Sequence, residues 1–240
     1  MFIIVNLTIT ILLLFSFAFP FDGAAATLSG TVVLKGTPPK RKRLDMGLDP
    51  NCVSLTPKGA WSEDVLTGEN GGLANAFIFV KEGLPKRDYP IPQPLVLLDR
   101  ECQFSPHVFG LLVGQTLEVR NLDPTFHNVH VKSKANAEYN VGMPVQNSRV
   151  THKFAKQEIG VKVVGDLHPW EFAYVHILEH PYFAVSNPRG SFAIRDLPAG
   201  TYTIAAWHEV YGTSEQKAQI SADTEVLFRF TTGDHRAKVR

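Results

Sequence analysis

Hydrophobic and polar positions alternate along the chain in short runs, and turn residues separate these runs. In residues 116–120 the apolar Leu117 and Val119 alternate with polar side chains, so both would face inward from one strand. Similar runs rich in Val, Ile, Phe, Thr and Tyr occupy residues 29–34, 76–81, 94–98, 128–131, 148–154, 160–164, 173–178, 191–194, 201–206 and 226–230. Many short strands with Gly and Pro turns predict an all-β fold built from sandwiches. No segment has sustained helical spacing, and the Gly-rich stretch 56–72 is expected to be a loop.

The first part of the chain is apolar and carries no charged side chain before Asp22. The small residues Ala24, Ala25 and Ala26 follow, as they do at a signal-peptidase site. We therefore expect residues 1–26 to be a cleaved signal peptide, which gives a periplasmic or extracellular protein with no membrane partner. The alternative is an uncleaved anchor, because the apolar run is nearly long enough to span a bilayer.

Charge changes this picture little. The chain has 24 basic and 23 acidic side chains, a formal net charge of +1, and its one basic run is residues 40–43. A nucleic-acid-binding surface is strongly basic, so no nucleic-acid partner is expected, and the basic run is interpreted as a solvated loop.

The chain contains two cysteines, Cys52 and Cys102. An even number of cysteines in an exported protein indicates a disulfide. It would close a loop of about 50 residues and stabilise the fold by about 2–4 kcal/mol. The alternative is a pair of free thiols available to a metal.

The end of the chain has its own pattern. After a turn at residues 187–190, the run 191–202 gives one alternating strand, a Pro-Ala-Gly turn and a second strand. This pattern resembles the carboxypeptidase regulatory-like domain, a small immunoglobulin-like β-sandwich, which we assign to residues 186–240. Residues 30–36 look similar, so the region 27–75 either supplies the first strand of that sandwich, with the central domain inserted, or forms a separate edge strand.

Two segments in the middle of the chain carry the residues of most chemical interest. The run GQTLEVRN at 114–121 leads to His127 and Asn128, and His168 lies in the run VVGDLHPWE at 163–171. They resemble the ligand segments of cupredoxins of the plastocyanin and amicyanin type. In that family a strand G-x-x-L-x-V-x-N leads to a ligand His followed by Asn, and a later loop supplies C-x-x-H-x-x-M. The resemblance spans residues 76–185 and implies a cupredoxin-like Greek-key β-sandwich that binds copper for electron transfer.

The chain departs from that pattern at two of the four ligand positions. Aligned on His168, the Cys position holds Gly165 and the Met position holds Glu171. A blue-copper site needs a thiolate with two imidazoles, so none should form here. The resemblance carries over only His127 and His168 as ligands, with Asn128 as the residue that links the two ligand loops.

Two interpretations of the altered site follow. In the first, His127, His168 and Glu171 form a harder site for copper as Cu(II), or for zinc, to which His107 or His130 could lend a further nitrogen. His127 and His130 are three residues apart, so a regular strand would place them on opposite faces. In the second interpretation the site is a relic that holds no metal.

The leading hypothesis is an exported, non-enzymatic cupredoxin-like protein with an altered or lost metal site and a redox or envelope protein as partner. The runner-up is a carbohydrate-binding or structural sandwich of the cell envelope that needs no metal. A weaker idea is an enzyme that uses an open His/His/Glu site. The motifs G-x-S-x-G and H-E-x-x-H and a phosphate-binding glycine loop are absent from the sequence, which argues against the commonest hydrolase mechanisms.

Overall fold

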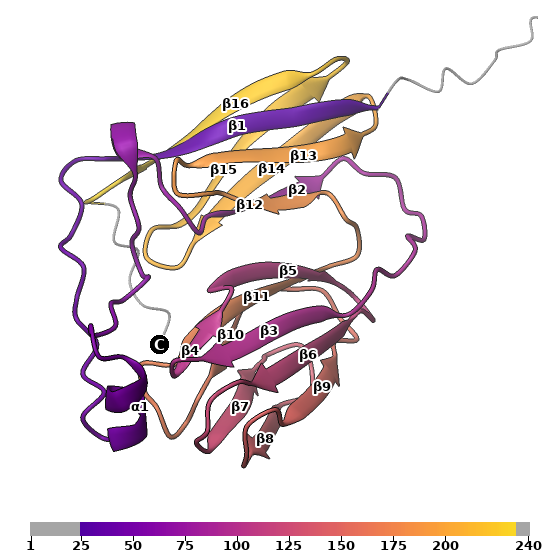
Figure 1. Ribbon diagram of the computed structural model, residues 1–240. Coiled ribbons are helices and arrows are strands. Elements are labelled where there is room, and N and C mark those ends of the chain that lie inside the picture. The colour runs from indigo at the N-terminus through magenta and orange to yellow at the C-terminus, as the bar shows by residue number, and fades with distance from the viewer. Residues whose placement is uncertain (1–24, 234–240) are drawn as a thin grey trace, which may run out of the picture.

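The structure, a computed structural model, describes residues 25–233 of the chain. Two β-sandwiches lie one above the other, and a long violet segment runs down one side of both (Figure 1). The predicted all-β class is therefore confirmed. The signal peptide expected over residues 1–26 lies, apart from its last two residues, outside the described part. Within that part no helix is long and apolar enough to cross a membrane.

The upper sandwich is built from both ends of the chain, and we name it the terminal sandwich. One sheet has the order β13-β1-β16, with strands Ser191–Leu197, Ala26–Lys35 and Thr224–Thr231. The other has the order β12-β2-β14-β15, with strands Phe183–Val185, Phe77–Glu82, Gly200–His208 and Gly212–Ile220. Its core combines inward residues of both sheets, such as Leu28, Val32, Ile78, Ile204 and Phe228.

The lower sandwich is one continuous stretch between β2 and β12, and we name it the inserted sandwich. Its five-stranded sheet has the order β5-β11-β10-β7-β8, with strands Val108–Leu112, Phe172–Leu178, Glu158–Val164, His127–Lys132 and Tyr139–Met143. Its four-stranded sheet has the order β4-β3-β6-β9, with strands Gln103–Ser105, Leu95–Arg100, Thr116–Asn121 and Arg149–Lys153. As expected, Leu117 and Val119 point into the core between the sheets.

Strand pairing differs from the expected boundaries at both ends of the middle unit. β1 lies between β13 and β16, so the N-terminal strand belongs to the terminal sandwich and the central domain is inserted. β2 and β12 pair with each other, and β2 pairs with β14. Residues 77–82 and 183–185, assigned by sequence to the unit 76–185, thus lie in the terminal sandwich. The first four residues of β2 are buried on both faces of the strand. Their continuous apolar run therefore does not indicate which sheet the strand joins.

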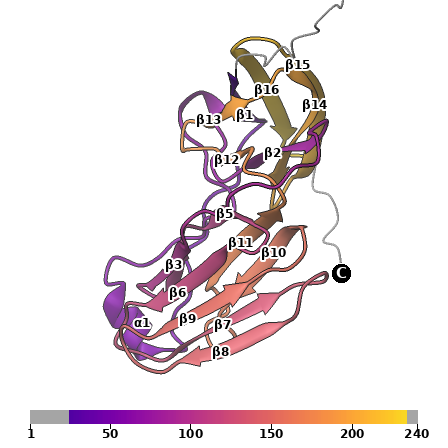
Figure 2. The same ribbon diagram turned by 90° about the vertical axis from the view of Figure 1, so that its right-hand side faces the viewer.

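A long connection, residues 36–76, links β1 to β2 and covers the end of the inserted sandwich; we call it the strap. It contains the short helix α1 (Pro50–Leu55) and the 3₁₀ turn η1 (Glu69–Gly71). The helix, which the apolar pattern did not predict, begins because the Asp49 side chain accepts a hydrogen bond from the Asn51 amide and Pro50 fits the first turn. Turned by 90°, α1 stays beside the strands of the inserted sandwich (Figure 2).

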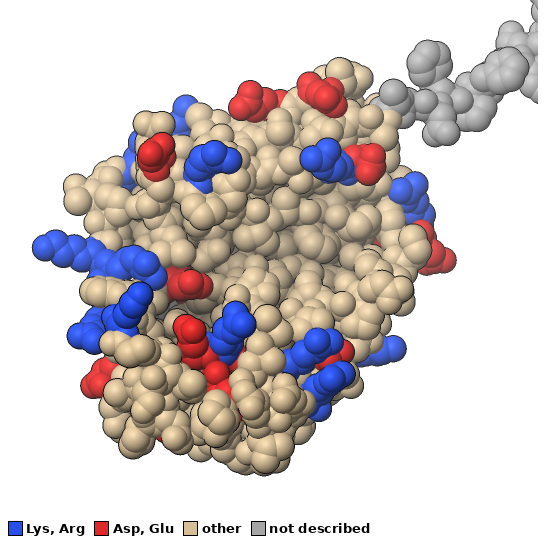
Figure 3. Space-filling model, in the orientation of Figure 1, with Lys and Arg blue, Asp and Glu red and all other residues tan. Residues whose placement is uncertain are grey.

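The surface carries charges of both signs. Lys and Arg are interspersed with Asp and Glu over the face of Figure 3, and the surface is hollowed between the two sandwiches. The mixture of charges on this face agrees with the near-neutral composition.

Candidate metal centre

His127 is the first residue of β7 and its side chain is fully buried. The turn before it is shaped by Asn121, whose side-chain amide donates to the Thr125 carbonyl at 2.8 Å. The Asn121 side-chain oxygen accepts from the Asp123 amide at 2.8 Å. These bonds fold residues 121–125 back and direct the imidazole of His127 into the sandwich.

His168 and Glu171 lie in the loop between β10 and β11. The Glu171 amide donates to the His168 carbonyl at 2.8 Å, and the Gly165 amide donates to the Glu171 carbonyl at 2.9 Å. Trp170 lies beside the His168 ring, tilted, at a centroid distance of 5.2 Å, and donates from Nε1 to the Cys102 carbonyl. The tight loop therefore turns His168 and Glu171 to the same side, toward His127.

The three predicted donors come together. The Nδ1 atoms of His127 and His168 are 3.1 Å apart, and the Glu171 oxygens lie 3.1 Å from Nδ1 of His127 and 3.5 Å from Nδ1 of His168. One donor atom from each of the three side chains lies within 4.8 Å of the others. His127 and Glu171 are 0% exposed and His168 is 3% exposed, so the cluster is closed to solvent.

A further buried carboxylate, Asp99, lies beside His127 and was not predicted. It is 0% exposed, and its Oδ2 lies 3.5 Å from Nδ1 of His127. The available signal was strand alternation: in β3, Asp99 and Leu97 face inward together, so a carboxylate stood at a core position of a strand. We call His127, His168 and Glu171 the donor cluster.

The outward nitrogens of both rings are held by carboxylates. Nε2 of His127 lies 3.2 Å from Oδ2 of Asp123, and Nε2 of His168 lies 3.0 Å from Oδ2 of Asp49. Around metal-ligating histidines, a carboxylate commonly accepts the proton of one ring nitrogen, and the lone pair of the other nitrogen is then available to the metal. Both Nδ1 atoms face the Glu171 carboxylate.

The charges of the cluster are strongly coupled. Burial alone would lower the pKa of His127, but Asp123 and Glu171 raise it to about 9. Burial alone would raise the pKa of Glu171, but His127 and His168 lower it to about 2. Burial, reinforced by the Glu171 charge, raises the pKa of Asp99 well above its ordinary value. In the described part of the chain, the ion pairs of Asp99 and Glu171 all go to the two imidazoles.

Asn128 links the two ligand loops. Its Oδ1 accepts from the amides of Asp166 and Leu167 at 2.9 and 3.4 Å. Its Nδ2 donates to Asn140 at 2.9 Å and to Asp166 at 3.3 Å. The β7 end and the β10–β11 loop are thus fixed relative to one another.

The other two candidate histidines have partners elsewhere. His130 faces away from His127, with Nδ1 2.9 Å from Asp166 and Nε2 2.6 Å from Glu138. His107 pairs through Nε2 with Glu209 of the terminal sandwich. Strand alternation separates His130 from the donor cluster, and His107 instead ties the two sandwiches together.

The strap closes the site from outside. Cys52 and Cys102 form a disulfide, as expected, so neither offers a free thiolate to a metal. Cys52 Sγ lies 3.7 Å from Nε2 of His168, and the Cys102 amide donates to Asp123 at 2.8 Å. The disulfide therefore lies against the carboxylate-bound side of both imidazoles.

Gly165 lies against the Glu171 carboxylate, which occupies the space that a side chain at position 165 would need. A Cβ added to Gly165 would lie 1.9 Å from Oε2 of Glu171. Gly165 and Glu171 are thus linked in space, because the carboxylate from position 171 occupies the volume beside position 165.

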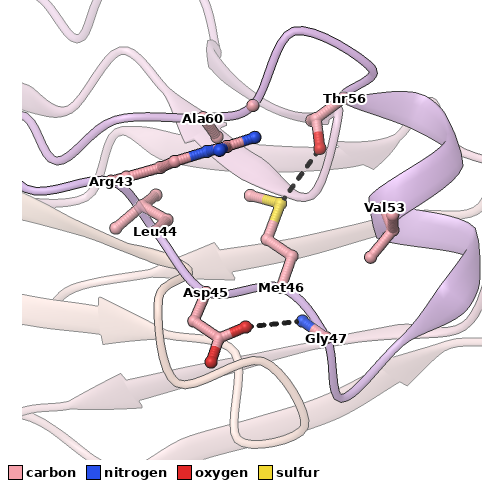
Figure 4. A pocket seen from close by; sticks show the side chains of 9 residues that line it. Arg43, Leu44, Asp45, Met46, Gly47, Val53, Thr56 and Ala60 are labelled. Atoms are coloured by element: carbon pink, nitrogen blue, oxygen red, sulfur yellow. Dashed lines mark hydrogen bonds between the residues drawn. The ribbon is translucent and has the colours of Figure 1, made fainter.

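A pocket of about 410 Å³ opens on the strap, lined in part by Arg43, Asp45, Met46 and Thr56 (Figure 4). Thr56 donates to Met46 Sδ at 3.3 Å and Asp45 accepts from the Gly47 amide at 3.0 Å. The lining residues include no member of the donor cluster, so the cluster is not reached through this pocket.

Comparison with known proteins gives weak structural similarities only. No family model matches the chain, and no curated protein matches it. A Cu-containing nitrite reductase from Thermus scotoductus is 18% identical, with a TM-score of 0.35, over 41% of this chain and only 25% of its own. A purple cupredoxin from Nitrosopumilus maritimus is 19% identical, with a TM-score of 0.30, over 35% of this chain and 98% of its own. A reduced amicyanin variant is 17% identical, with a TM-score of 0.32, over 35% of this chain and 82% of its own. These scores are too low to assign a family or a function.

Proposed function

We propose that this exported, non-enzymatic protein binds one divalent ion, Cu(II) or Zn(II), through Nδ1 of His127, Nδ1 of His168 and the Glu171 carboxylate. The observation that supports it most is a fully buried carboxylate facing two imidazole nitrogens whose partner nitrogens are held by Asp123 and Asp49. Burying an ionised carboxylate is costly unless a cation or hydrogen bonds compensate it. Within the described residues, the cationic groups that face the Glu171 carboxylate are the two imidazoles, with Nδ1 of His127 3.1 Å and Nδ1 of His168 3.5 Å away.

The spacing of the donors supports an ion of this class. In a tetrahedral zinc site with bonds of about 2.0–2.1 Å, neighbouring donors are about 3.3–3.4 Å apart. The three separations between these donor atoms are 3.1, 3.1 and 3.5 Å. Imidazole and carboxylate donors suit Cu(II) and Zn(II) better than Cu(I).

A blue-copper centre does not fit these residues. Its strong visible absorption needs a thiolate, and this chain has a glycine at that position and both cysteines in a disulfide. Catalysis at the ion is not supported either, because a catalytic metal keeps an open position and this cluster is closed by the strap. We therefore propose metal binding without blue-copper electron transfer.

The test is metal titration of chelator-stripped protein with CuCl₂ and with ZnCl₂, followed by calorimetry. We expect one equivalent to bind, a rise in the melting temperature and only a weak visible absorption with copper. His127→Ala and His168→Ala should each abolish binding, whereas His130→Ala, a control on the opposite face of β7, should leave it unchanged. Binding that survives both donor substitutions, or an intense blue colour in the unmodified protein, would contradict the proposal.

A further inference from the structure

One part of the strap, residues 40–62, differs in charge from the rest of this nearly neutral chain, and we call it the lower strap. It carries five basic and two acidic side chains, whereas the whole chain has a net charge of +1. Within the described residues none of the five basic side chains forms an ion pair, and all five are exposed. The basic residues are Lys40, Arg41, Lys42, Arg43 and Lys58.

The carboxylates near the lower strap do not neutralise these cations. Asp49 is bound to Nε2 of His168 at 3.0 Å, and Asp45 accepts from the Gly47 amide. The next carboxylate along the chain, Glu63, lies 4.0 Å from Nδ1 of His107 at the junction of the two sandwiches. Several Lys and Arg side chains project from the left edge of Figure 3, where the strap runs in Figure 1. The lower strap therefore presents an excess of positive charge to solvent.

Apolar side chains are exposed on the same segment. Leu48 is 77% exposed, Val53 50% and Trp61 45%. They are three of the eight large apolar side chains that the described residues expose, although residues 40–62 are only 23 of those 209 residues. Such a concentration of exposed apolar side chains marks an interaction surface more often than isolated ones do.

The cations and the apolar side chains lie side by side. Arg43 and Trp61 are directly opposite each other in an antiparallel bridge, which places their side chains on one face. Arg43 and Val53 both line the pocket of about 410 Å³ that opens on the strap (Figure 4). The apolar residues of that pocket are Leu44, Met46, Val53 and Ala60. A guanidinium, an indole and an aliphatic wall thus form a single amphipathic face.

Partners of two classes carry negative charge: acidic polymers and membranes with anionic lipids. A soluble polymer satisfies the cations but leaves Leu48 and Val53 in water. A lipid surface satisfies both, because phosphates at the surface attract Lys and Arg while apolar side chains enter the boundary with the acyl chains. Trp61 also suits that boundary, where an indole has one apolar and one hydrogen-bonding side. The observations therefore favour a membrane.

We infer that the lower strap is a docking face for membranes that contain anionic phospholipids. The basic side chains contact lipid phosphates, and Leu48, Val53 and Trp61 enter the boundary between headgroups and acyl chains. The attachment is reversible and weakened by salt, because screening reduces the attraction between exposed charges. This inference departs from the expectation of no membrane partner and from the interpretation of residues 40–43 as a solvated loop, since neither considered the apolar side chains beside them. It does not depend on the proposed metal binding.

The test is co-sedimentation of the exported protein with vesicles of phosphatidylglycerol and phosphatidylcholine, compared with vesicles of phosphatidylcholine alone. We expect partition into the anionic vesicles to be at least about tenfold stronger and to fall as salt is added. Tryptophan emission should shift to shorter wavelength on anionic vesicles, and Trp61→Phe should remove this shift. Stripping metal with a chelator should leave partition unchanged.

Two sets of variants separate the contributions of charge and of apolar contact. A basic side chain near an anionic surface strengthens partition about fivefold, so Lys42→Glu combined with Arg43→Glu should weaken it at least about 25-fold. Leu48→Ser should weaken it about tenfold through lost apolar burial. The matched controls lie on exposed positions of the terminal sandwich: Lys217→Glu combined with Arg229→Glu, and Leu227→Ser. They should retain most of the partition, and every variant should melt near the unmodified protein because only exposed side chains change.

The outcomes are separable from those of metal binding. No preference for anionic vesicles, or equal losses in the controls and the strap variants, would overturn the docking face whether or not metal binds. If the charge variants lose binding but Leu48→Ser does not, and heparin binds the same cations as tightly, the face takes an acidic polymer and the membrane inference is overturned. Vesicle binding by a protein that holds no metal would support the docking face while the proposed function fails.

Discussion

At the residue scale, Gly165 and Glu171 compete for the same volume in the donor cluster. A Cβ at position 165 would meet Oε2 of Glu171 at 1.9 Å and Cδ at 2.9 Å. The carboxylate cannot swing into solvent, since Glu171 is fully buried between two imidazoles. The glycine is therefore required by the glutamate, and the two positions should be energetically coupled.

We predict that Gly165→Ala lowers the free energy of unfolding by about 1–3 kcal/mol, as overpacking of a closed core does. It should also weaken metal binding, because the added methyl displaces the Glu171 carboxylate. In a Glu171→Ala background the same substitution should cost much less. Urea unfolding of the four proteins of this double-mutant cycle measures the coupling.

The control for this cycle is Gly233→Ala, where an added Cβ meets nothing within 4 Å. It should leave stability unchanged. Equal costs of Gly165→Ala in both backgrounds would show that the two residues do not share space in solution.

At the scale of elements, the strap is fastened to the ligand loops by side chains from two directions. Asp49, the N-cap of α1, binds Nε2 of His168, and Trp170 of the ligand loop donates to the Cys102 carbonyl at 3.2 Å. The disulfide joins α1 to the turn that follows β3. Asp99 lies in β3, two residues before this turn begins. Opening this bond should loosen the cover of the site and one of its walls together.

We predict that Cys52→Ala combined with Cys102→Ala lowers the free energy of unfolding by about 2–4 kcal/mol. Release of bound Zn(II) to an excess of chelator should become faster by at least about tenfold, because the outer partner of His168 is no longer held. Stopped-flow chelation measures the rate. Val53→Ala, at a half-exposed position of α1, is the control and should change neither quantity. An unchanged release rate in the double variant would show that the strap does not limit exchange.

At the scale of the whole molecule, the two sandwiches share an apolar interface. Phe77 and Phe79 of the terminal sandwich pack with Val108 and Leu178 of the inserted one. His176 of β11 lies in this interface, stacked on Phe77 at 3.9 Å and beside Trp207 at 4.5 Å. Its Nδ1 accepts from the Gly160 amide at 3.2 Å, and burial lowers its pKa to about 3.

The sign of the pH effect follows from this shift. A pKa below the ordinary value of 6.5 means that the folded state binds fewer protons than the unfolded state. The contribution of His176 to stability is present above pH 6.5 and is lost as the pH falls toward 3. We predict that His176→Phe, which keeps the ring stack, makes the urea midpoint fall less between pH 6.5 and 4 than it does in the unmodified protein.

His208, buried in the terminal sandwich with a pKa lowered to about 3 by burial, acts in the same direction and should leave part of the acid sensitivity in the variant. His130→Gln is the control, since burial lowers the pKa of this histidine but Asp166 and Glu138 together raise it above its ordinary value. It should not flatten the fall. A His176→Phe protein that is as acid-sensitive as the unmodified one would rule out this interface as the titrating element.

The sequence by itself determined the features that depend on local pattern. Period-two alternation predicted the all-β class and the inward side of β6, and the resemblance to two ligand segments pointed to His127, His168, Glu171 and Asn128 as candidates. The disulfide followed from an even cysteine count. Only the tertiary structure decided which sheet each strand joins, because β2 and β12 are apolar runs that carry no label for a partner. It alone brought Asp99, Asp49 and Asp123 to the imidazoles, because those contacts join strands and a strap far apart in the chain. Side chains from distant parts of the chain form the donor cluster only after folding, whereas sequence spacing indicates closeness only between residues of one loop.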